Sequence, residues 1–497
     1  MSTHHYSGSR FRAALVHYVL GRGLNALLSI GLFVALARVL PVASYASYVA
    51  LWALTELLLA VGNLGTDWIT AGEIPRLRQS LQGRALRRLI GAVLAVQGCS
   101  FGILALLWFS FDRALAGALG LAADPAIAIF AATLMIEGVS RSVRDQMLSS
   151  LLLQWVGQSG QLFRNGAVFV FLLVSASSGR GVELVDVVWC EVLAALAALT
   201  FSAGYLAWVL RKVPAEEQVE QLPWAALAKR ALLAWVGGFG ALLLSAQTAL
   251  ILIGRAAGPE VGAAVGFARN LAEQVRRFMP IEFGFAIFRT FLLSRFAIDQ
   301  SAHKLWNRMQ LAWRVNAVLL TLALALSICF GDEIGALISG GRYPAAGYAL
   351  VFWMVWVLAW SQHRLVDTLA HTLGKSKAVV MTSAALLPAL LLLVWAAQSS
   401  EPMMTVAVLA LCEFIYAWAL IRVGLPRPPG EPAGRFRSEW AKLLVAGALA
   451  VGVGWALKVK LPQLPWEGSA ALAALLFLFA IAGLRVLRRA DFKVFSA

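Results

Sequence analysis

The sequence predicts an all-α membrane protein with 14 transmembrane helices, arranged as two pseudo-symmetric six-helix bundles around a central cavity, with two extra C-terminal helices. Three observations indicate this fold class. The 497 residues are 60% hydrophobic and only 14% charged, and the mean hydropathy is +0.76, which is typical of polytopic membrane proteins. Apolar runs of about 20 residues recur along the whole chain. The connections between them are alternately rich and poor in lysine and arginine.

Each apolar run is long enough for one helix to cross the hydrocarbon core of a bilayer. The expected spans lie near residues 15–40, 44–65, 89–111, 125–150, 160–178, 186–210, 231–254, 261–288, 311–331, 346–372, 378–398, 403–421, 441–459 and 468–487. The connections are short, so no sizeable extramembrane domain is expected. The polar N-terminal segment leads into a full span, so no cleavable signal peptide is expected.

The positions of lysine and arginine orient the chain in the membrane. With the N-terminus in the cytoplasm, the inner segments hold 27 of these residues and the outer segments hold seven. This bias predicts a multi-pass protein of the bacterial inner membrane with both termini cytoplasmic. The net charge of +16 is explained by the inner loops, so nucleic acid is not an expected partner.

Two polar linkers that contain proline divide the chain into groups of six, six and two spans. The expected parts are an N-lobe at 1–210 with spans 1–6, a cytoplasmic linker at 211–230, a C-lobe at 231–422 with spans 7–12, a second cytoplasmic linker at 423–440, and a segment at 441–497 with spans 13–14 and the C-terminal tail.

The two lobes show signs of an internal repeat. An offset of 217 residues places Arg38 on Arg255 at the outer ends of spans 1 and 7, and Glu56 on Glu273 within spans 2 and 8. Because each repeat holds an even number of helices, the repeats are expected to have parallel topology, related by an axis along the membrane normal.

The eighth expected span carries Arg269, Glu273, Arg276 and Arg277, which share one face of a helix. Each ionised side chain costs roughly 2.5–3.5 kcal/mol at mid-membrane on insertion scales, so this face must meet protein or water. One interpretation is ion pairing within the helix. One acid cannot neutralise three arginines, however, so the positive surplus predicts that this face binds an anion.

Two other spans carry charged residues at helical spacing. Span 4 has Glu137, Arg141, Arg144 and Asp145, whose charges balance, so internal pairing is the favoured interpretation. In span 10, an arginine, an aspartate and a histidine fall on one face. Arginine suits phosphate or carboxylate because its guanidinium group stays charged and binds both in a bidentate manner.

We therefore expect a cationic cavity that takes a large or lipidic anion. Its candidate head-group-binding residues are Arg22, Asn25, Arg141, Arg269, Arg276, Arg277 and Arg364. The candidates for ion coupling or gating are Glu273, Asp367 and His371. Walker A, nucleophile-elbow and HExxH motifs are absent, so neither an enzyme nor a cofactor or metal site is expected.

Two hairpins follow a common pattern, in which an arginine precedes a short turn and small or aromatic residues open the next helix. They read GRGLNALLSIGLFVALARVLPVASYASYVALWALTELLLAVGNLG at 21–65 and LILIGRAAGPEVGAAVGFARNL at 250–271. The positions that fit in the first hairpin are Tyr45, Tyr48, Gly62 and Gly65. With 14 spans in groups of six, six and two, the chain resembles the multidrug/oligosaccharidyl-lipid/polysaccharide exporter superfamily, and most of all its polysaccharide transporter branch of O-antigen and exopolysaccharide flippases.

The resemblance implies a flippase that moves an undecaprenyl-diphosphate-linked oligosaccharide from the cytoplasmic to the periplasmic leaflet by alternating access, for synthesis of O-antigen, capsule or exopolysaccharide. The implied partners are membrane lipids and the machinery for polysaccharide polymerisation and export. Where the family often has an aspartate in span 7, this chain has Gln247 and Thr248, so no cation site is carried over there.

Four alternatives to this function remain open. A lipid II flippase shares the span count and the cavity arginines. An ion-coupled drug antiporter of the same superfamily would want an acidic cavity. A membrane polymerase or ligase would want a larger outer loop. A structural scaffold would have no use for same-face arginines inside a span.

Overall fold

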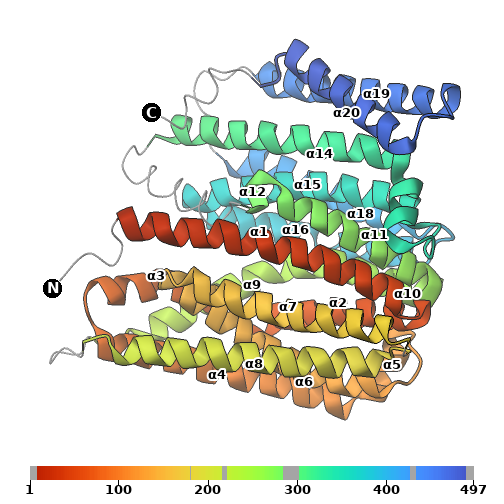
Figure 1. The fold of residues 1–497 in the computed structure, drawn as a ribbon. Coiled ribbons are helices and arrows are strands. Elements are labelled where there is room, and N and C mark those ends of the chain that lie inside the picture. Colours follow the sequence, from red (N-terminus) through yellow and green to blue (C-terminus); the bar gives the residue numbers. More distant parts are fainter. Residues whose placement is uncertain (1–7, 180, 215–220, 284–300, 426–432, 488–497) are drawn as a thin grey trace. The chain divides into compact units, whose positions relative to one another are not determined.

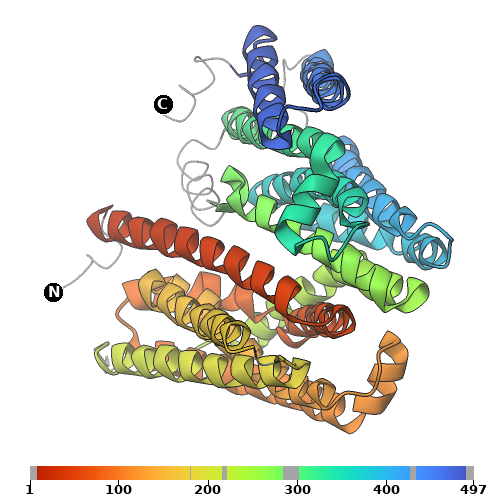
Figure 2. The same cartoon turned by 45° about the vertical axis from the view of Figure 1, so that its right-hand side comes forward.

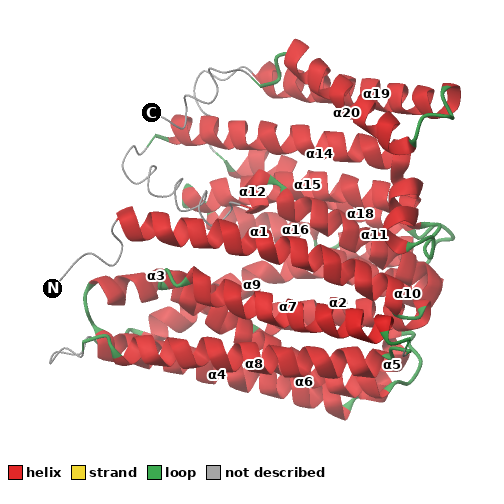
Figure 3. Ribbon diagram, in the orientation of Figure 1, coloured by secondary structure: helices red, strands yellow, loops and turns green. Residues whose placement is uncertain are grey.

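The computed structural model describes residues 8–179, 181–214, 221–283, 301–425 and 433–487. Within these ranges the chain is built from helices joined by short loops and contains no β-strand (Figure 3). The expected all-α class is therefore confirmed. The helices group into two compact units, which are described separately.

The first unit comprises residues 1–243 together with 258–262. Its helices are α1 (Gly8–Val39), α2 (Val42–Gly62), α3 (Thr66–Gln79), α4 (Gly83–Ser110), α5 (Asp112–Leu119), α6 (Pro125–Arg141), the π-helix η1 (Ser142–Leu148), α7 (Gln154–Ser177), α8 (Leu184–Arg211) and α9 (Trp224–Leu243) (Figure 1). The start of α6 is fixed by Asp124, whose carboxylate accepts the amide N–H of Ala126 at 2.7 Å, and by the proline that follows it.

The second unit comprises residues 244–257 and 263–497. Its helices are α10 (Ala246–Ala257), α11 (Pro259–Phe278), α12 (Pro280–Phe283), α14 (Ala302–Ser339), α15 (Ala346–Thr372), α16 (Ser376–Leu386), α17 (Ala389–Ala397), α18 (Met403–Ala419), the π-helix η2 (Leu420–Gly424), α19 (Ala433–Lys460) and α20 (Trp466–Gly483). The last two helices pack on each other, and α19 packs along α14 (Figure 2).

The same helix pairings recur in both units, as an internal repeat requires. In the first unit α1 packs on α7, α4 on α6, α6 on α8, and α7 on α8. In the second unit the counterparts by chain order pair in the same way: α10 with α17, α14 with α15, α15 with α18, and α17 with α18. The pseudo-symmetry read from two matched residues therefore extends to the packing of whole helices.

Twelve helical segments of the described chain are long and apolar enough to span a membrane. The bent pair α16 and α17, with an angle of 42° at its break, makes a thirteenth if it counts as one span. The protein is thus a multi-pass membrane protein. The segment expected at 231–254 consists of two helices, α9 in the first unit and α10 in the second.

The eighth expected span, near residues 261–288, is not among the helical segments that are long and apolar enough to cross a membrane. Its helix α11 carries the same-face charges, which lower its apolarity, and residues 284–288 of the expected span lie outside the described residues. A total of 14 spans therefore stays a prediction.

Candidate functional site

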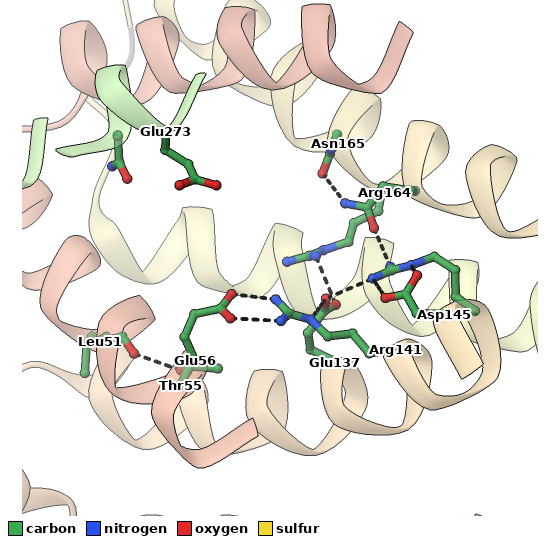
Figure 4. A network of polar contacts seen from close by, with 12 residues as sticks. Leu51, Thr55, Glu56, Glu137, Arg141, Asp145, Arg164, Asn165 and Glu273 are labelled. Carbon is green, nitrogen blue, oxygen red and sulfur yellow. Dashed lines mark hydrogen bonds and ion pairs between the residues drawn. The ribbon is translucent and has the colours of Figure 1, made fainter. Parts of the chain in front are cut away.

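A network of ion pairs joins α2, α6 and α7 within the first unit (Figure 4). Arg141 donates to both carboxylate oxygens of Glu56, with Nη2–Oε1 and Nη1–Oε2 distances of 2.6 and 2.9 Å. Its Nε donates to Glu137 Oε1 at 2.9 Å. Arg164 of α7 donates from Nη1 to Glu137 Oε2 at 3.0 Å, and its guanidinium carbon lies 5.3 Å from the centroid of the Trp52 ring. The pairing expected inside span 4 is thus present and extends to two further helices.

The network is most deeply buried at Glu137, whose side chain is 2% exposed, against 10% for Arg164. At the other end, the side chains of Arg141 and Glu56 are each 33% exposed. Such a pair within a membrane span must meet water or a polar ligand, because lipid would not solvate it. The Arg141–Glu56 pair is therefore the part of the network that a ligand can reach.

The π-helix η1 follows directly on Arg141 and carries Arg144 and Asp145. Arg144 pairs with Asp145, with Nε–Oδ1 and Nη2–Oδ2 distances of 2.9 Å, and makes a short contact with Gln161 of α7. Its Nη2 also lies 3.8 Å from the carboxylate of Glu137. Counted together, the network holds three acids and three arginines and is electrically balanced.

Two predicted head-group residues lie on α1, apart from the contacts of this network. Arg22 donates to the hydroxyl of Tyr18 at 2.7 Å. Asn25 is 7% exposed and donates to the side-chain and backbone oxygens of Gln158 on α7, at 2.8 and 3.2 Å. In this structure Asn25 therefore joins α1 to α7.

In the second unit, the charged helix α11 is anchored to α15 and to the loop before it. The indole N–H of Trp353 donates to the carbonyl of Val265 at 3.1 Å, and Phe267 stacks on Tyr343 with ring centroids 5.0 Å apart. These anchors belong to the N-terminal half of α11, where Glu260 in the first turn is the one charged residue, whereas the same-face charges lie in its C-terminal half. The charged face is thereby held by a packed segment rather than by a loop.

The charged half of α11 is centred on Glu273, whose side chain is 9% exposed. Arg276 Nη2 lies 2.5 Å from Glu273 Oε1, and Arg277 Nε lies 3.6 Å from the same oxygen. Arg269 interacts with Glu273 electrostatically, and its Nη1 donates a hydrogen bond to Asn270 Oδ1 at 3.3 Å. Within the described chain, Arg269 Nε donates no hydrogen bond and Glu273 Oε2 accepts none, although both atoms are buried.

Two arginines of the predicted set, Arg276 and Arg364, lie near the ring of Trp360 on α15. The guanidinium carbon of Arg276 lies 4.1 Å from the centroid of the Trp360 ring, and that of the exposed Arg364 lies 6.0 Å from it. An aromatic ring attracts a guanidinium group by cation–π interaction. The structure thus brings together Arg276, Arg364 and, through Glu273, the rest of the α11 charges.

Two ionisable residues of α15, His363 and Asp367, contact α18. Asp367 Oδ1 accepts the hydroxyl of Tyr416 at 3.0 Å, and Asp367 Oδ2 lies 3.7 Å from His371 Nε2. One turn earlier, His363 Nδ1 makes a short contact with Glu413 Oε2. Asp367 and His371, predicted as coupling groups, therefore lie in one line with a histidine–glutamate pair.

Sequence reasoning missed the part played by three residues. Arg164 was not among the predicted site residues, but its side chain on α7 pairs with Glu137; its place in an apolar run, followed by Asn165, was the available signal. Trp360 gave no signal beyond its spacing of four from Arg364. Glu413 has no charged neighbour at helical spacing in the sequence, and only the fold shows its partner.

No protein-family model matches the sequence, and no curated protein matches it in sequence. Solved structures do match in fold. The lipid II flippase MurJ in an inward closed conformation has a TM-score of 0.67 at 11% identity, covering 95% of this chain and 99% of that one. An inward-facing multidrug resistance MATE family transporter of the MOP superfamily has a TM-score of 0.60 at 12% identity, covering 82% and 98%.

A MOP superfamily transporter from Pyrococcus furiosus, described as having a binding pocket of reverse polarity, has a TM-score of 0.56 at 12% identity and covers 82% of this chain and 95% of that one. At these identities the likeness concerns the fold. The chain therefore has the fold of the MurJ and MATE transporters, with the comparison to MurJ extending over nearly its whole length.

Proposed function

We propose that the protein is a flippase of the MOP superfamily, in its polysaccharide transporter branch, which moves a lipid-linked oligosaccharide with a diphosphate group from the cytoplasmic to the periplasmic leaflet of the bacterial inner membrane. The observation that carries the proposal is the guanidinium group of Arg269, which is partly buried in a membrane protein and has a donor without a hydrogen-bond partner among the described residues. A guanidinium group in that setting is suited to an oxyanion ligand, because an N–H to phosphate bond would satisfy the buried donor.

The surrounding charges support an anionic ligand. On α11 three arginines, Arg269, Arg276 and Arg277, outnumber the two glutamates, Glu260 and Glu273. Trp360 of α15 lies within cation–π distance of the guanidinium groups of Arg276 and Arg364, so these two positive charges gather at one ring. A cationic drug would be repelled by the same surface, so the drug antiporter is disfavoured.

The fold supports transport of a lipid-borne substrate. The comparison with the lipid II flippase covers 95% of this chain, whereas the MATE transporter covers 82%. The proposed partners are accordingly membrane lipids and the polymerase and export machinery that receive the flipped oligosaccharide. Both termini are proposed to be cytoplasmic, on the basis of the lysine and arginine distribution.

The test is the leaflet on which lipid-linked oligosaccharides accumulate. In a deletion strain we expect intact repeat units on the cytoplasmic leaflet, and we expect the same in strains that carry Arg269→Ala or Arg276→Ala at normal membrane levels. Arg113→Ala, which removes an exposed arginine on α5, is the matched control and should export normally. Export that persists in both variants would make these arginines structural and refute the proposal.

The likeness to MurJ favours one second candidate, the flipping of lipid II. The same extraction separates the two, because the trapped lipid would carry a peptidoglycan precursor instead of a polysaccharide repeat unit. Repeat units that reach the periplasmic leaflet without being polymerised would indicate a polymerase or ligase.

A further inference from the structure

A second set of ionisable side chains lies between α15 and α18 and takes no part in the proposed anion site. His363 Nδ1 contacts Glu413 Oε2, and the imidazole ring lies against the ring of Tyr416, with centroids 3.8 Å apart. The Tyr416 hydroxyl donates to Asp367 at 3.0 Å, and the far oxygen of Asp367 lies 3.7 Å from His371. Five groups that can accept or donate a proton therefore form one continuous line.

The line follows from helical spacing. Residues 363, 367 and 371 are separated by four positions, so they share one face of α15, and residues 413 and 416 share one face of α18. Exposure of the side chains rises along the line, from 8% at Glu413 and 18% at His363 to 23% at Asp367 and 25% at His371. The line thus leads from a buried pair toward the C-terminal end of α15.

Other charged groups lie on the helices that pack around this line. On α15 and α18, Arg364 is the one charged residue outside the line among the described residues, and it is exposed. On α14, Arg308 and Arg314 are buried, and Arg314 donates to the carbonyl of Val486 at 3.4 Å. The exposed cations on the neighbouring loop, α16 and η2 are Lys375, Lys377 and Arg422. The carboxylate in contact with the ring of His363 is that of Glu413.

The electrostatics of a membrane span make this pair a proton acceptor. An ionised carboxylate within the bilayer costs several kcal/mol unless it is paired. With a neutral imidazole, the His363–Glu413 pair carries one negative charge, and one added proton makes it an imidazolium–carboxylate pair with no net charge. No covalent bond between heavy atoms changes, and release of the proton to water restores the first state.

We propose that His363 and Glu413 bind the proton whose movement drives transport, and that Asp367 and His371 pass it between this pair and the cytoplasmic side. The direction follows from the predicted orientation, which places the end of α15 and the lysines after it in the cytoplasm. The coupling part of this inference rests on the proposed flippase function. The proton-binding part does not.

The first experiment titrates the histidines of the full-length protein in lipid nanodiscs, using ¹⁵N-histidine NMR. His363→Asn assigns the signal. We expect the ring of His363 to change protonation state as the pH is varied, and we expect Glu413→Gln to require a higher proton concentration for the same change, because the carboxylate that stabilises the imidazolium is removed. His303→Asn removes an exposed histidine on α14 and should leave the signal unchanged. Absence of titration, or a titration that Glu413→Gln leaves unmoved, would overturn the proton site.

The second experiment measures the leaflet distribution of the lipid-linked oligosaccharide in cells. Strains with His363→Asn or Glu413→Gln, at normal membrane levels, should trap it on the cytoplasmic leaflet, as should wild-type cells treated with a protonophore. Normal export in either variant would overturn coupling through this pair. If the deletion strain itself traps no oligosaccharide, the proposed function fails, while the NMR titration still decides whether the pair binds a proton.

Discussion

Replacing Glu137 by glutamine tests whether the ion-pair network holds the first unit together. The carboxylate of Glu137 is 2% exposed and is the common partner of Arg141, Arg164 and, at 3.8 Å, Arg144. Glutamine keeps the shape of the side chain but removes its charge. Arg164 is 10% exposed and forms an ion pair with Glu137 alone among the described residues, so the change would leave it as a buried cation on α7.

The expected loss of stability is large because only one partner of a buried pair is removed. Such changes cost about 3–5 kcal/mol, most of it from the uncompensated charge that stays behind. Glu56→Gln is the matched comparison, since it removes a carboxylate from the same network at a side chain that is 33% exposed. Water can solvate that end, and Arg141 keeps Glu137, so we expect a cost of about 1 kcal/mol or less.

The measurement is thermal unfolding of the purified full-length protein in detergent. A domain of this size changes its Tm by roughly 2–4 °C per kcal/mol, so Glu137→Gln should lower the Tm by at least about 6 °C. The double variant Glu137→Gln, Arg164→Gln removes both charges and should recover part of the loss, as contacting residues are coupled. A Tm within about 2 °C of the wild type, or an equal loss in Glu56→Gln, would refute the view that Glu137 is the stabilising centre.

Three further predictions concern packing and the arginine face. Gly138→Ala places a methyl group against the ring of Phe101, which is 2% exposed, and should cost about 1–3 kcal/mol in thermal unfolding, less when combined with Phe101→Leu. Gly65→Ala should lower stability by more than about 1–2 kcal/mol, because Gly65 has a φ of +69° and its new Cβ would meet a backbone carbonyl of α9. Trp360→Leu removes the ring under Arg276 and should raise the concentration of inorganic diphosphate needed for half-maximal thermal stabilisation by about 2- to 30-fold, with Trp360→Phe closer to the wild type.

The sequence predicted the features that depend on local periodicity. Runs of about 20 apolar residues located the spans, and the spacing of Glu137 and Arg141 located an ion pair within α6, because both follow directly from the helical repeat. It did not predict which acid meets Arg141 across helices, since Glu56 lies 85 residues away. Nor did it predict the π-helix η1, whose widened turn leaves no regular pattern in the sequence.

Charge spacing in α11 left several pairings open. Ion pairing of Glu273 with Arg269, Arg276 and Arg277 was the expected alternative to anion binding. In the structure, Glu273 pairs with Arg276 and Arg277 on the next turn, as that alternative expects, whereas Arg269 donates its hydrogen bond to Asn270. Spacing permits several pairings on one helix face, and the neighbouring side chains select among them.

The two units therefore carry different electrostatics on a repeated fold. In the first unit each arginine of the network has a carboxylate partner, whereas α11 carries three arginines and two glutamates, one of which, Glu260, lies in its first turn. If Arg141 binds an anionic head group, that group must first displace Glu56, whose two oxygens already occupy the guanidinium fork that a phosphate would use. Both side chains of that pair are 33% exposed, so the exchange uncovers no buried charge. Arg269 needs no such exchange, because its buried donor has no hydrogen-bond partner among the described residues. An anion can therefore bind at α11 without displacing a carboxylate from Arg269, whereas Arg141 can bind an anion only once Glu56 has been released.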